Sequence, residues 1–325
     1  DEFLDMDNDG IEDNEDLDRD GDGWMNIVEI DCDSDPDNFE EIPNDLDSDT
    51  ICDNLDEDID GDDLPNDWEV ERGLDPMNKN DTIVCHGLSK YCLRNYDDFT
   101  FPETHNAFAT SEDGVILGTN HYTGLQAQWD GGVRAFMVDA HHLSEDETEA
   151  EDVRFCHGSP GQFPHPCAYS EVDAFEWLSL LNSQMNLTDE SCLFVCGEVV
   201  SILVENYVPA DHLEFLFNQT GILERVFIHQ LGEPWPSIGD MILQKKDVVI
   251  YVQSEYNESF SYFHPAWKHS WDTPYGQQDK EEMICELGRG DSSQSVWHLS
   301  NWLSSIFGTA DPYKAHEVNE YEFLL

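Results

Sequence analysis

The stretch "GVRAFMVDAHH", residues 132–142, consists mainly of apolar side chains and ends on polar ones, as a short buried strand does. Similar apolar runs follow at 192–206, 225–230 and 247–254. Segments with helical periodicity lie between them, at 171–185, 210–221 and 237–246. Buried strands that alternate with helices predict an α/β fold with a parallel sheet. The length of the region, roughly 240 residues, predicts closure into a (β/α)8 TIM barrel.

The ends of these predicted strands carry polar side chains suited to catalysis. A histidine–asparagine pair stands in "TFPETHNAF", a second histidine in "RFCHGSPG", an aspartate in "VRAFMVDAHH" and a glutamate in "SILVENYV". Two histidines beside oxygen ligands suit the cleavage of a phosphodiester, because one can take a proton from the attacking hydroxyl and the other can protonate the leaving oxygen. The candidates are His105, Asn106, Asp139, His157 and Glu205. We assign no role to the remaining histidines of this region, among them His141, His142, His165 and His264.

The same region resembles a known family. The motifs "YDDFTFPETHNAF", "GGVRAFMVDAHH", "FCHG", "VVSILVENYV", "WPSIGDMI", "WDTPYG" and "CELGRG…HLSNWL" follow one another between about Cys85 and Phe307. In this order they resemble the phosphatidylinositol-specific phospholipase C X-domain family, and most of all its secreted plant- and microbe-type branch. The resemblance implies a distorted TIM barrel, in agreement with the pattern of strands and helices.

The resemblance also implies roles for single residues. It makes His105 the general base and His157 the general acid, and it aligns Asn106, Asp139 and Glu205 with positions that bind catalytic calcium in the eukaryotic signalling enzymes. The fourth calcium ligand of those enzymes is a glutamate, and this chain has Met137 in its place. A thioether is a poor ligand for calcium, so the implied catalytic calcium site is incomplete.

Basic residues that could bind a substrate are few. Arg134 matches an arginine of the family in the same strand, and we predict that it contacts either the phosphate or a buried carboxylate. Asp139 and Glu205 could in turn be satisfied by Arg134 and backbone amides instead of a metal. The other candidates for substrate binding are Lys245, Lys246, Lys268 and Arg289.

The N-terminal part of the chain is strongly acidic. The formal net charge is −58, and residues 1–76 hold 33 of the 72 Asp and Glu against only Arg19 and Arg72. Such a segment cannot fold by apolar burial alone, because its charges repel one another. It is therefore either disordered or neutralised by bound cations. Nucleic acid is excluded as a partner, because a polyanion would be repelled.

A 13-residue step runs through this acidic segment. "DRDGDGWMNIVE", residues 18–29, reads D-x-D-x-D-G-x-x-N-x-x-E, the spacing with which an EF-hand-like loop surrounds calcium. Three further loops, 5–16, 45–56 and 58–69, keep this register, with Thr50 and Asp63 in the glycine position of the last two. The predicted calcium ligands are Asp5, Asp7, Asp9, Asp13, Asp16, Asp18, Asp20, Asp22, Asn26, Glu29, Asp45, Asp47, Asp49, Asp53, Asp56, Asp58, Asp60, Asp62, Asn66 and Glu69.

The acidic segment resembles thrombospondin type 3 repeats, which are aspartate-rich segments wound around calcium. We therefore divide the chain into calcium-binding repeats over 1–76, a linker over 77–84, and a phospholipase C-like domain over 85–325.

Cysteines and glycosylation sequons place the chain outside the cell. Nine cysteines stand beside four N-x-[ST] sequons, at Asn80, Asn186, Asn218 and Asn257, which favours a secreted or cell-surface glycoprotein with disulfides. Plausible pairs are Cys32–Cys52, Cys85–Cys92 and Cys156–Cys167, and Cys285 or one of Cys192 and Cys196 is left over. No apolar run approaches the roughly 20 residues that span a bilayer. No signal peptide is visible, so we interpret the chain as a mature form or a fragment of a longer precursor.

Two functions from different classes fit the sequence. The first is an extracellular phosphodiesterase that cleaves phosphoinositides or a glycosyl-phosphatidylinositol (GPI) anchor. The second is a structural or adhesive glycoprotein, a filament or matrix subunit, in which the domain is a scaffold with little or no activity. His105 and His157 favour the enzyme, whereas Met137 and the acidic spacer favour the structural protein.

Overall fold

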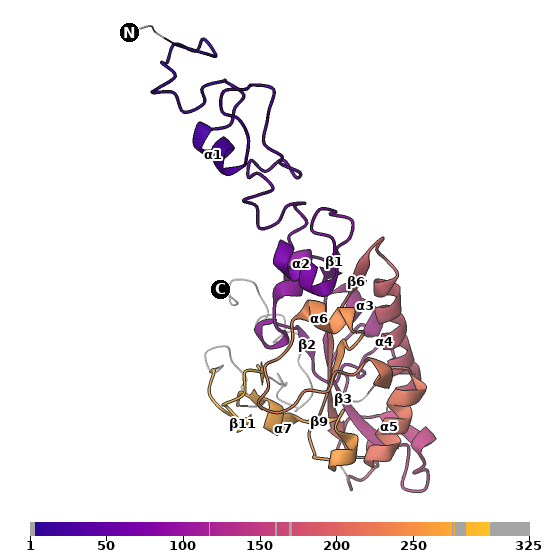
Figure 1. Cartoon of the computed structure of the whole chain (residues 1–325). Coiled ribbons are helices and arrows are strands. Elements are labelled where there is room, and N and C mark those ends of the chain that lie inside the picture. The colour runs from indigo at the N-terminus through magenta and orange to yellow at the C-terminus, as the bar shows by residue number, and fades with distance from the viewer. Residues whose placement is uncertain are drawn as a thin grey trace. The chain divides into compact units, whose positions relative to one another are not determined.

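The structure is a computed structural model, and it describes residues 4–116, 118–159, 161–168, 171–274, 276 and 284–299. The chain forms two compact units, Asp1–Ile83 and Val84–Leu325 (Figure 1). In the described residues no helix is both long and apolar enough to cross a membrane.

The described part of the first unit consists of loops with two short helices, α1 (Asn26–Asp31) and α2 (Asn66–Arg72). Its four acidic loops share the same internal hydrogen bonds. In each loop the first aspartate accepts from the backbone N–H five residues later, as Asp18 does from Gly23 at 3.1 Å and Asp58 from Asp63 at 3.0 Å. The residue in this sixth position has a positive φ even where it is Thr50 or Asp63, so the tight turn is formed without glycine.

The second unit is built on a mixed sheet. Three parallel strands form its centre, β3 (Ala135–His142), β7 (Val200–Asn206) and β8 (Val248–Val252). Two short strands extend it in parallel, β2 (Glu103–Thr104) beside β3 and β9 (His264–Pro265) beside β8. β4 (Val153–Phe155) and β5 (Val172–Asp173) continue it in antiparallel fashion beyond β3.

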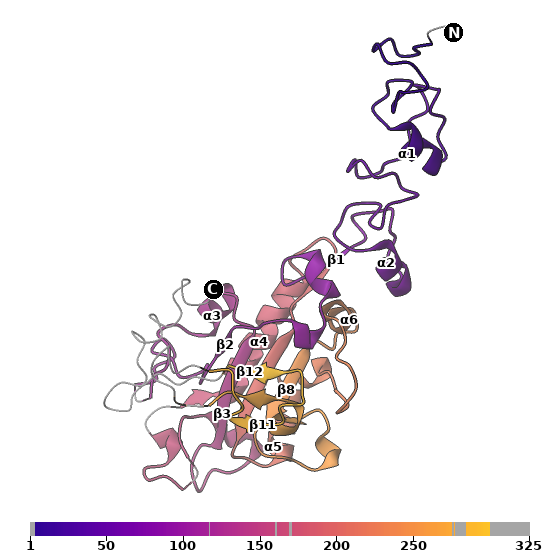
Figure 2. The ribbon, with the colours of Figure 1, turned by 90° about the vertical axis from the view of Figure 1, so that its left-hand side faces the viewer.

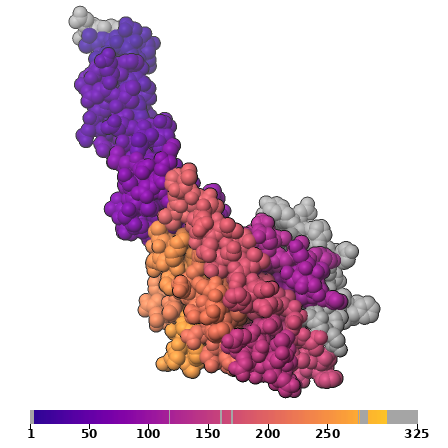
Figure 3. Space-filling model, turned by 90° about the vertical axis from the view of Figure 1, so that its right-hand side faces the viewer, coloured from indigo at the N-terminus to yellow at the C-terminus, as the bar shows by residue number. Residues whose placement is uncertain are grey.

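Helices cover one face of this sheet, where the apolar core lies. α3 (Leu125–Asp130), α4 (Ala174–Asp189) and α5 (Ala210–Gln219) lie on this side in Figures 1 and 2. The residues of α4 and α5 form a continuous outer surface (rose) in Figure 3. Every second residue of the central strands points into this core, which contains Phe136, Val138, Ile202, Val204 and Ile250.

The remaining elements are short. β1 (Ile83–Cys85) pairs with β6 (Val195–Gly197), and β10 (Trp271–Asp272) forms a small separate sheet with β11 (Arg289–Gly290) and β12 (Trp297–His298). α6 (Ile238–Leu243) precedes β8, and α7 (Ala266–His269) follows β9. Single-turn 3-10 helices occur at Ser89–Leu93, Tyr96–Asp98, Ala150–Asp152, Pro166–Ala168, Leu223–Arg225 and Glu258–Phe260.

The α/β class agrees with the prediction from the sequence, but a closed (β/α)8 barrel is not found among the described residues. The strand path ends at β5 on one side and at β9 on the other. β4 follows β3 after ten residues, 143–152, and a connection of this length is too short for the helical crossover that a parallel strand needs. The predicted strand at 225–230 is reduced to a single bridge from Val226 to Val248.

Four disulfides hold the described part of the chain. Three are the pairs suggested by the sequence, Cys32–Cys52, Cys85–Cys92 and Cys156–Cys167. The fourth joins Cys192 to Cys196, and Cys285 is free and exposed. Both members of the 192/196 pair are therefore used, and of the candidates for the leftover cysteine Cys285 remains.

Candidate functional site

The face of the sheet that is turned away from the helices carries the polar residues. Asp139 on β3 is the register partner of Glu205 on the adjacent β7. Because side chains alternate along a strand, both project to the side opposite the core residues Val138 and Val204. This side of the sheet borders a cavity of about 550 Å³ whose walls include Glu103, His105, Met137, Glu205, Asp272 and Arg289.

His105 enters this cavity from the loop that follows β2. Its backbone carbonyl accepts a hydrogen bond from His121 Nε2 at 2.7 Å, in the tautomer that carries its proton there. The backbone N–H of Ala107 donates to the carbonyl of Met137 at 2.8 Å, which ties the loop to the middle of β3. Burial lowers the pKa of His105, and the carboxylate of Glu205 opposes this shift. A neutral imidazole, which can accept a proton, is therefore favoured.

His157 approaches the same carboxylate from the loop that follows β4. The backbone N–H of Cys156 donates to the carbonyl of Asp139 at 3.2 Å, and the Cys156–Cys167 disulfide closes the loop. A Cβ atom on Gly118 would lie 3.2 Å from Nδ1 of His157, so this close approach depends on glycine. Burial lowers the pKa of His157, and Glu205 again opposes the shift. The two histidines thus share one carboxylate neighbour.

Buried oxygen atoms lie close to the two histidines. Asn106 is 1% exposed, and in the described part of the chain neither its Oδ1 nor its Nδ2 has a hydrogen-bond partner. Oδ1 of Asp139 is buried in the same way, and burial together with the charge of Glu205 raises the pKa of Asp139 well above its usual range. The carboxylate of Glu205 accepts a hydrogen bond from Tyr207 Oη and another from Gln253 Nε2, both at 2.8 Å.

These oxygens form a donor set that fits a hard divalent cation. Asn106, Asp139 and Glu205 would supply one amide and two carboxylate ligands, and unpartnered buried oxygens are what such an ion would satisfy. Met137 lines the cavity but offers no oxygen.

Of the two contacts predicted for Arg134, phosphate or buried carboxylate, the structure shows the carboxylate, at a distance from the catalytic candidates. Arg134 precedes β3, at the end of the strand opposite to Asp139, and its side chain lies over the Trp129 ring at 3.8 Å. The guanidinium binds Glu198, with both Nη2 to Oε1 and Nε to Oε2 at 3.1 Å, and Glu198 also binds His86. Arg134 therefore neutralises a half-buried carboxylate that is neither Asp139 nor Glu205.

Of the four other basic candidates, only Arg289 lines the cavity within the described ranges. Its Nε donates to Asp272 Oδ2 at 2.7 Å, and its guanidinium lies over the Trp267 ring at 3.9 Å. The three lysines bind elsewhere: Lys245 to Asp189, Lys246 to the carbonyl of Glu224, and Lys268 to Glu255. Tyr275 and residues 300–303, which belong to the quoted motifs, lie outside the described residues.

Comparison with known proteins agrees with this arrangement. A family model described as PI-PLC X 1 matches residues 91–304. The chain belongs to the PI-PLC X family. A curated relative, the "PI-PLC X domain-containing protein 1" of Arthroderma benhamiae (strain ATCC MYA-4681 / CBS 112371), is 26% identical over 251 residues, which cover 73% of this chain and 75% of that protein. No solved structure matches the chain.

Sequence reasoning missed three residues of the PI-PLC X site. His141 received no role, and neither Tyr207 nor Asp272 was proposed, although Tyr207 binds Glu205 and Asp272 binds Arg289. His141 lies two residues after Asp139, and Tyr207 lies two residues after Glu205. Because residues i and i+2 of a strand share a face, this spacing could have pointed to both. No comparable signal pointed to Asp272, because its partner is 17 residues away.

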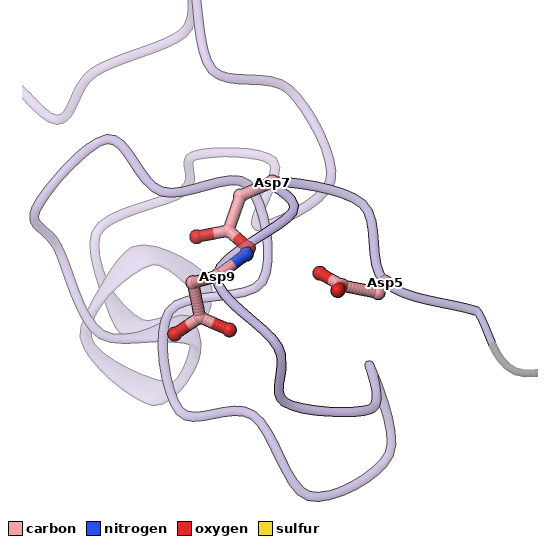
Figure 4. A group of neighbouring side chains, drawn as sticks. All are labelled: Asp5, Asp7 and Asp9. Atoms are coloured by element: carbon pink, nitrogen blue, oxygen red, sulfur yellow. The ribbon is translucent and has the colours of Figure 1, made fainter.

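The acidic loops of the first unit form four similar clusters. Each brings three aspartates together so that ligand oxygens lie within 4.8 Å of one another, and Figure 4 shows this for Asp5, Asp7 and Asp9. The other three clusters are Asp18, Asp20 and Asp22; Asp45, Asp47 and Asp49; and Asp58, Asp60 and Asp62.

Later loop positions fall into two groups. In the ninth position Asp13, Asn26, Asp53 and Asn66 each accept a backbone N–H from the second position of the same loop. In the twelfth position Glu29 and Glu69 are fully buried, and none of their carboxylate oxygens has a hydrogen-bond partner in the described chain.

Burial and the neighbouring aspartates raise the pKa of Glu29 to about 7 and that of Glu69 to about 8. The anionic form of each of these two carboxylates is therefore unfavourable unless a positive charge lies beside it within its own loop.

Proposed function

We propose that the second unit is a phosphodiesterase that cleaves inositol phosphodiesters, either phosphatidylinositol or a GPI anchor. The observation that carries this proposal is the meeting of His105 and His157, from the loops after two different strands, at the single carboxylate of Glu205. Two histidines near one another and near one carboxylate suit general acid–base catalysis of phosphodiester cleavage. Membership of the PI-PLC X family supports the choice of substrate class.

The reaction follows from these positions. Neutral His105 takes the proton of the inositol 2-hydroxyl, whose oxygen attacks phosphorus to form a cyclic phosphate. The bond from phosphorus to the glycerol oxygen breaks, and His157 supplies the proton that this leaving oxygen needs. His157 must be protonated for this step, and the negative charge of Glu205 favours that form against the effect of burial. Diacylglycerol then departs from phosphatidylinositol. Arg289, which lines the cavity, is the described basic residue placed to contact the phosphate or the inositol ring.

A divalent cation would bind between Asn106, Asp139 and Glu205. When bound, such an ion would supply positive charge beside the negatively charged phosphate. The buried, unpartnered oxygens of Asn106 and Asp139 support this assignment. Met137 leaves the set one carboxylate short, so we expect weaker binding than at a site with three carboxylates.

The first unit is proposed to bind several calcium ions in its four acidic loops. The clustered aspartates and the buried Glu29 and Glu69 support this proposal. The disulfides support an extracellular location. All four sequon asparagines are exposed, as attachment of N-glycans requires, although Asn186 also accepts a hydrogen bond from Arg225.

A structural glycoprotein is the second candidate. The first unit favours it, because about 80 residues of acidic loops serve no evident purpose in hydrolysis. In this case the chain would polymerise or bind a matrix partner through calcium-filled loops, and the second unit would act as a scaffold.

Turnover decides between these candidates. The experiment measures release of inositol phosphate from phosphatidylinositol vesicles and from a GPI-anchored reporter, with and without calcium. Wild type should release product, and His105→Ala should lose at least 100-fold in rate. His212→Ala is the matched control, because this histidine pairs with His142 and does not line the cavity. Absence of turnover on both substrates, together with calcium-dependent filaments in electron microscopy, would favour the structural protein.

A further inference from the structure

The residue that follows His157, Gly158, is contacted by two side chains of β3. Nε2 of His141 donates a hydrogen bond to the carbonyl oxygen of Gly158 at 3.0 Å, in the tautomer that carries its proton on Nε2. The backbone N–H of Gly158 lies near the carboxylate of Asp139 and lowers the pKa of this carboxylate, against the larger effect of burial. Asp139 and His141 are two residues apart on one strand, so both reach Gly158 from the same face. Gly158 is thus held by His141 through its carbonyl, and its N–H faces Asp139; these two groups belong to the peptide units that follow and precede Gly158.

The ring of His141 is itself fixed. The side chain is buried, with 4% exposure, and it stacks on Tyr207 with ring centroids 4.5 Å apart and planes 27° apart. Tyr207 is anchored at both ends, by its hydroxyl to Glu205 at 2.8 Å and by its backbone N–H to the carbonyl of Ala140 at 3.1 Å. His141 therefore cannot change its orientation unless a residue bound to Glu205 moves as well.

The loop around His157 has little room for other positions. A Cβ atom on Gly158 would lie 3.0 Å from both Gln162 Oε1 and Pro166 Cβ, which shows that the loop folds closely over this glycine. The Cys156–Cys167 disulfide closes the loop from the other side. The disulfide fixes where the loop begins and ends. The hydrogen bond from His141 to the Gly158 carbonyl holds the residue that follows His157.

We propose that His141 is a positioning residue: its hydrogen bond to the Gly158 carbonyl clamps the residue that follows His157 and so sets the orientation of His157, while Tyr207 links this clamp to Glu205. The inference rests on the proposed function, in which His157 is the general acid. A misplacement of the acid by about 1 Å costs up to 100-fold in rate, so the clamp matters for turnover more than for substrate binding.

Two substitutions separate the hydrogen bond from the ring. His141→Phe keeps the ring that stacks on Tyr207 but removes the donor, whereas His141→Gln removes the ring and places an amide N–H near the position of Nε2. Two properties of the full chain are measured: hydrogen exchange at the amides of His157 and Gly158, and kcat and KM on phosphatidylinositol vesicles. Thermal unfolding confirms that each variant is folded, and His212→Ala serves as the control.

We expect His141→Phe to speed exchange at these two amides by about tenfold and to lower kcat 10- to 100-fold with KM unchanged. His141→Gln should recover most of both properties, and His212→Ala should change neither. Unchanged exchange in His141→Phe overturns the inference, as does a His141→Gln variant that behaves like His141→Phe. If the wild type has no turnover, the proposed function fails, and the exchange measurement alone still tests the clamp.

Discussion

The two units of this chain solve the problem of buried carboxylates in different ways. In the second unit, Asp247 is fully buried and is bound by the guanidinium of Arg225, and Glu198 is bound by Arg134. In the first unit, Glu29 and Glu69 are equally buried, yet no basic side chain binds them in the described residues. The second unit therefore carries its own counter-charges, whereas the first must obtain them from solution.

Asp139 is the exception within the second unit. It is buried in the sheet, keeps one oxygen without a hydrogen-bond partner, and lies next to Glu205 without a basic neighbour among the described residues. In this respect it resembles the acidic loops more than the rest of its own unit. In both units, therefore, an unneutralised buried carboxylate marks a candidate binding site.

Removal of calcium should have the largest effect. Chelation with EGTA should abolish hydrogen-exchange protection in residues 4–83, because the clustered aspartates then repel one another without compensation. The strands β3, β7 and β8 should keep their protection in the same sample, because apolar residues and internal ion pairs hold them. Exchange mass spectrometry of the full chain measures both. Equal protection of the first unit with and without calcium would refute the assignment of calcium to the acidic loops.

Removal of the positive charge that neutralises a buried carboxylate should lower the free energy of unfolding of the second unit by several kcal/mol. Arg225→Met removes the partner of the fully buried Asp247 and should lower the free energy of unfolding by about 3–5 kcal/mol. Urea denaturation followed by tryptophan fluorescence measures the change. The double variant Arg225→Met/Asp247→Leu should recover most of the loss, because no buried charge remains unpaired. A single variant as stable as wild type would contradict this account.

The stability of the second unit should depend on the protonation of His264. Nδ1 of His264 bonds the carbonyl of Ile250 at 3.0 Å, and Nε2 accepts the N–H of His229 at 2.9 Å, so only the neutral ring fits. Burial, then the neighbouring His269, lowers the pKa of His264 to about 3. Below pH 6.5 the unfolded chain therefore takes up a proton that the folded chain refuses, and stability falls as the pH falls towards 3.

The expected slope is about 1.4 kcal/mol per pH unit from this residue. It can be isolated by comparing wild type with His264→Gln in urea denaturation between pH 7 and pH 5. The difference in unfolding free energy between the two proteins should shrink as the pH falls below 6.5 and should approach this amount per unit near pH 5. A difference that stays constant with pH would show that folding does not lower the pKa of His264.

An exposed ion pair should have the smallest effect. Lys268 and Glu255 lie 2.8 Å apart, but both side chains are 55% exposed. Lys268→Ala should therefore change the unfolding free energy by less than about 1 kcal/mol, because water and salt screen such pairs. If Lys268→Ala lowered the unfolding free energy as much as Arg225→Met, burial would not explain the difference between the exposed Lys268–Glu255 pair and the buried Arg225–Asp247 pair. The same urea measurement provides the answer.

Much of the arrangement could be predicted from local patterns. The run at 132–142 became β3, and the helical periodicities at 171–185 and 210–221 became α4 and α5, because a buried strand or amphipathic helix shows its period directly in the chain. His105 and His157, which the sequence motifs singled out, both lie near Glu205. The repeated acidic spacing produced four loops with common hydrogen bonds.

Other features depend on pairings that no local pattern encodes. Arg134 could have met a phosphate or a carboxylate, and the fold gave it Glu198, 64 residues away. The expected barrel did not close among the described residues, because β4 and β5 joined the edge of the sheet in antiparallel orientation. Cys192 paired with Cys196 because the chain between Glu190 and Val195 turns sharply enough to bring them together.

Motif order, strand period and acidic spacing are properties of neighbouring residues, so the chain shows directly which side chains could do chemistry. Which of these side chains lie together depends on the tertiary structure. It placed Arg134 beside Glu198, brought Arg289 and Asp272 to the cavity, and brought His141 to the carbonyl of Gly158. The physical reason is that a hydrogen bond or ion pair between distant segments depends on how strands are ordered and registered, and a single stretch of sequence does not specify this order.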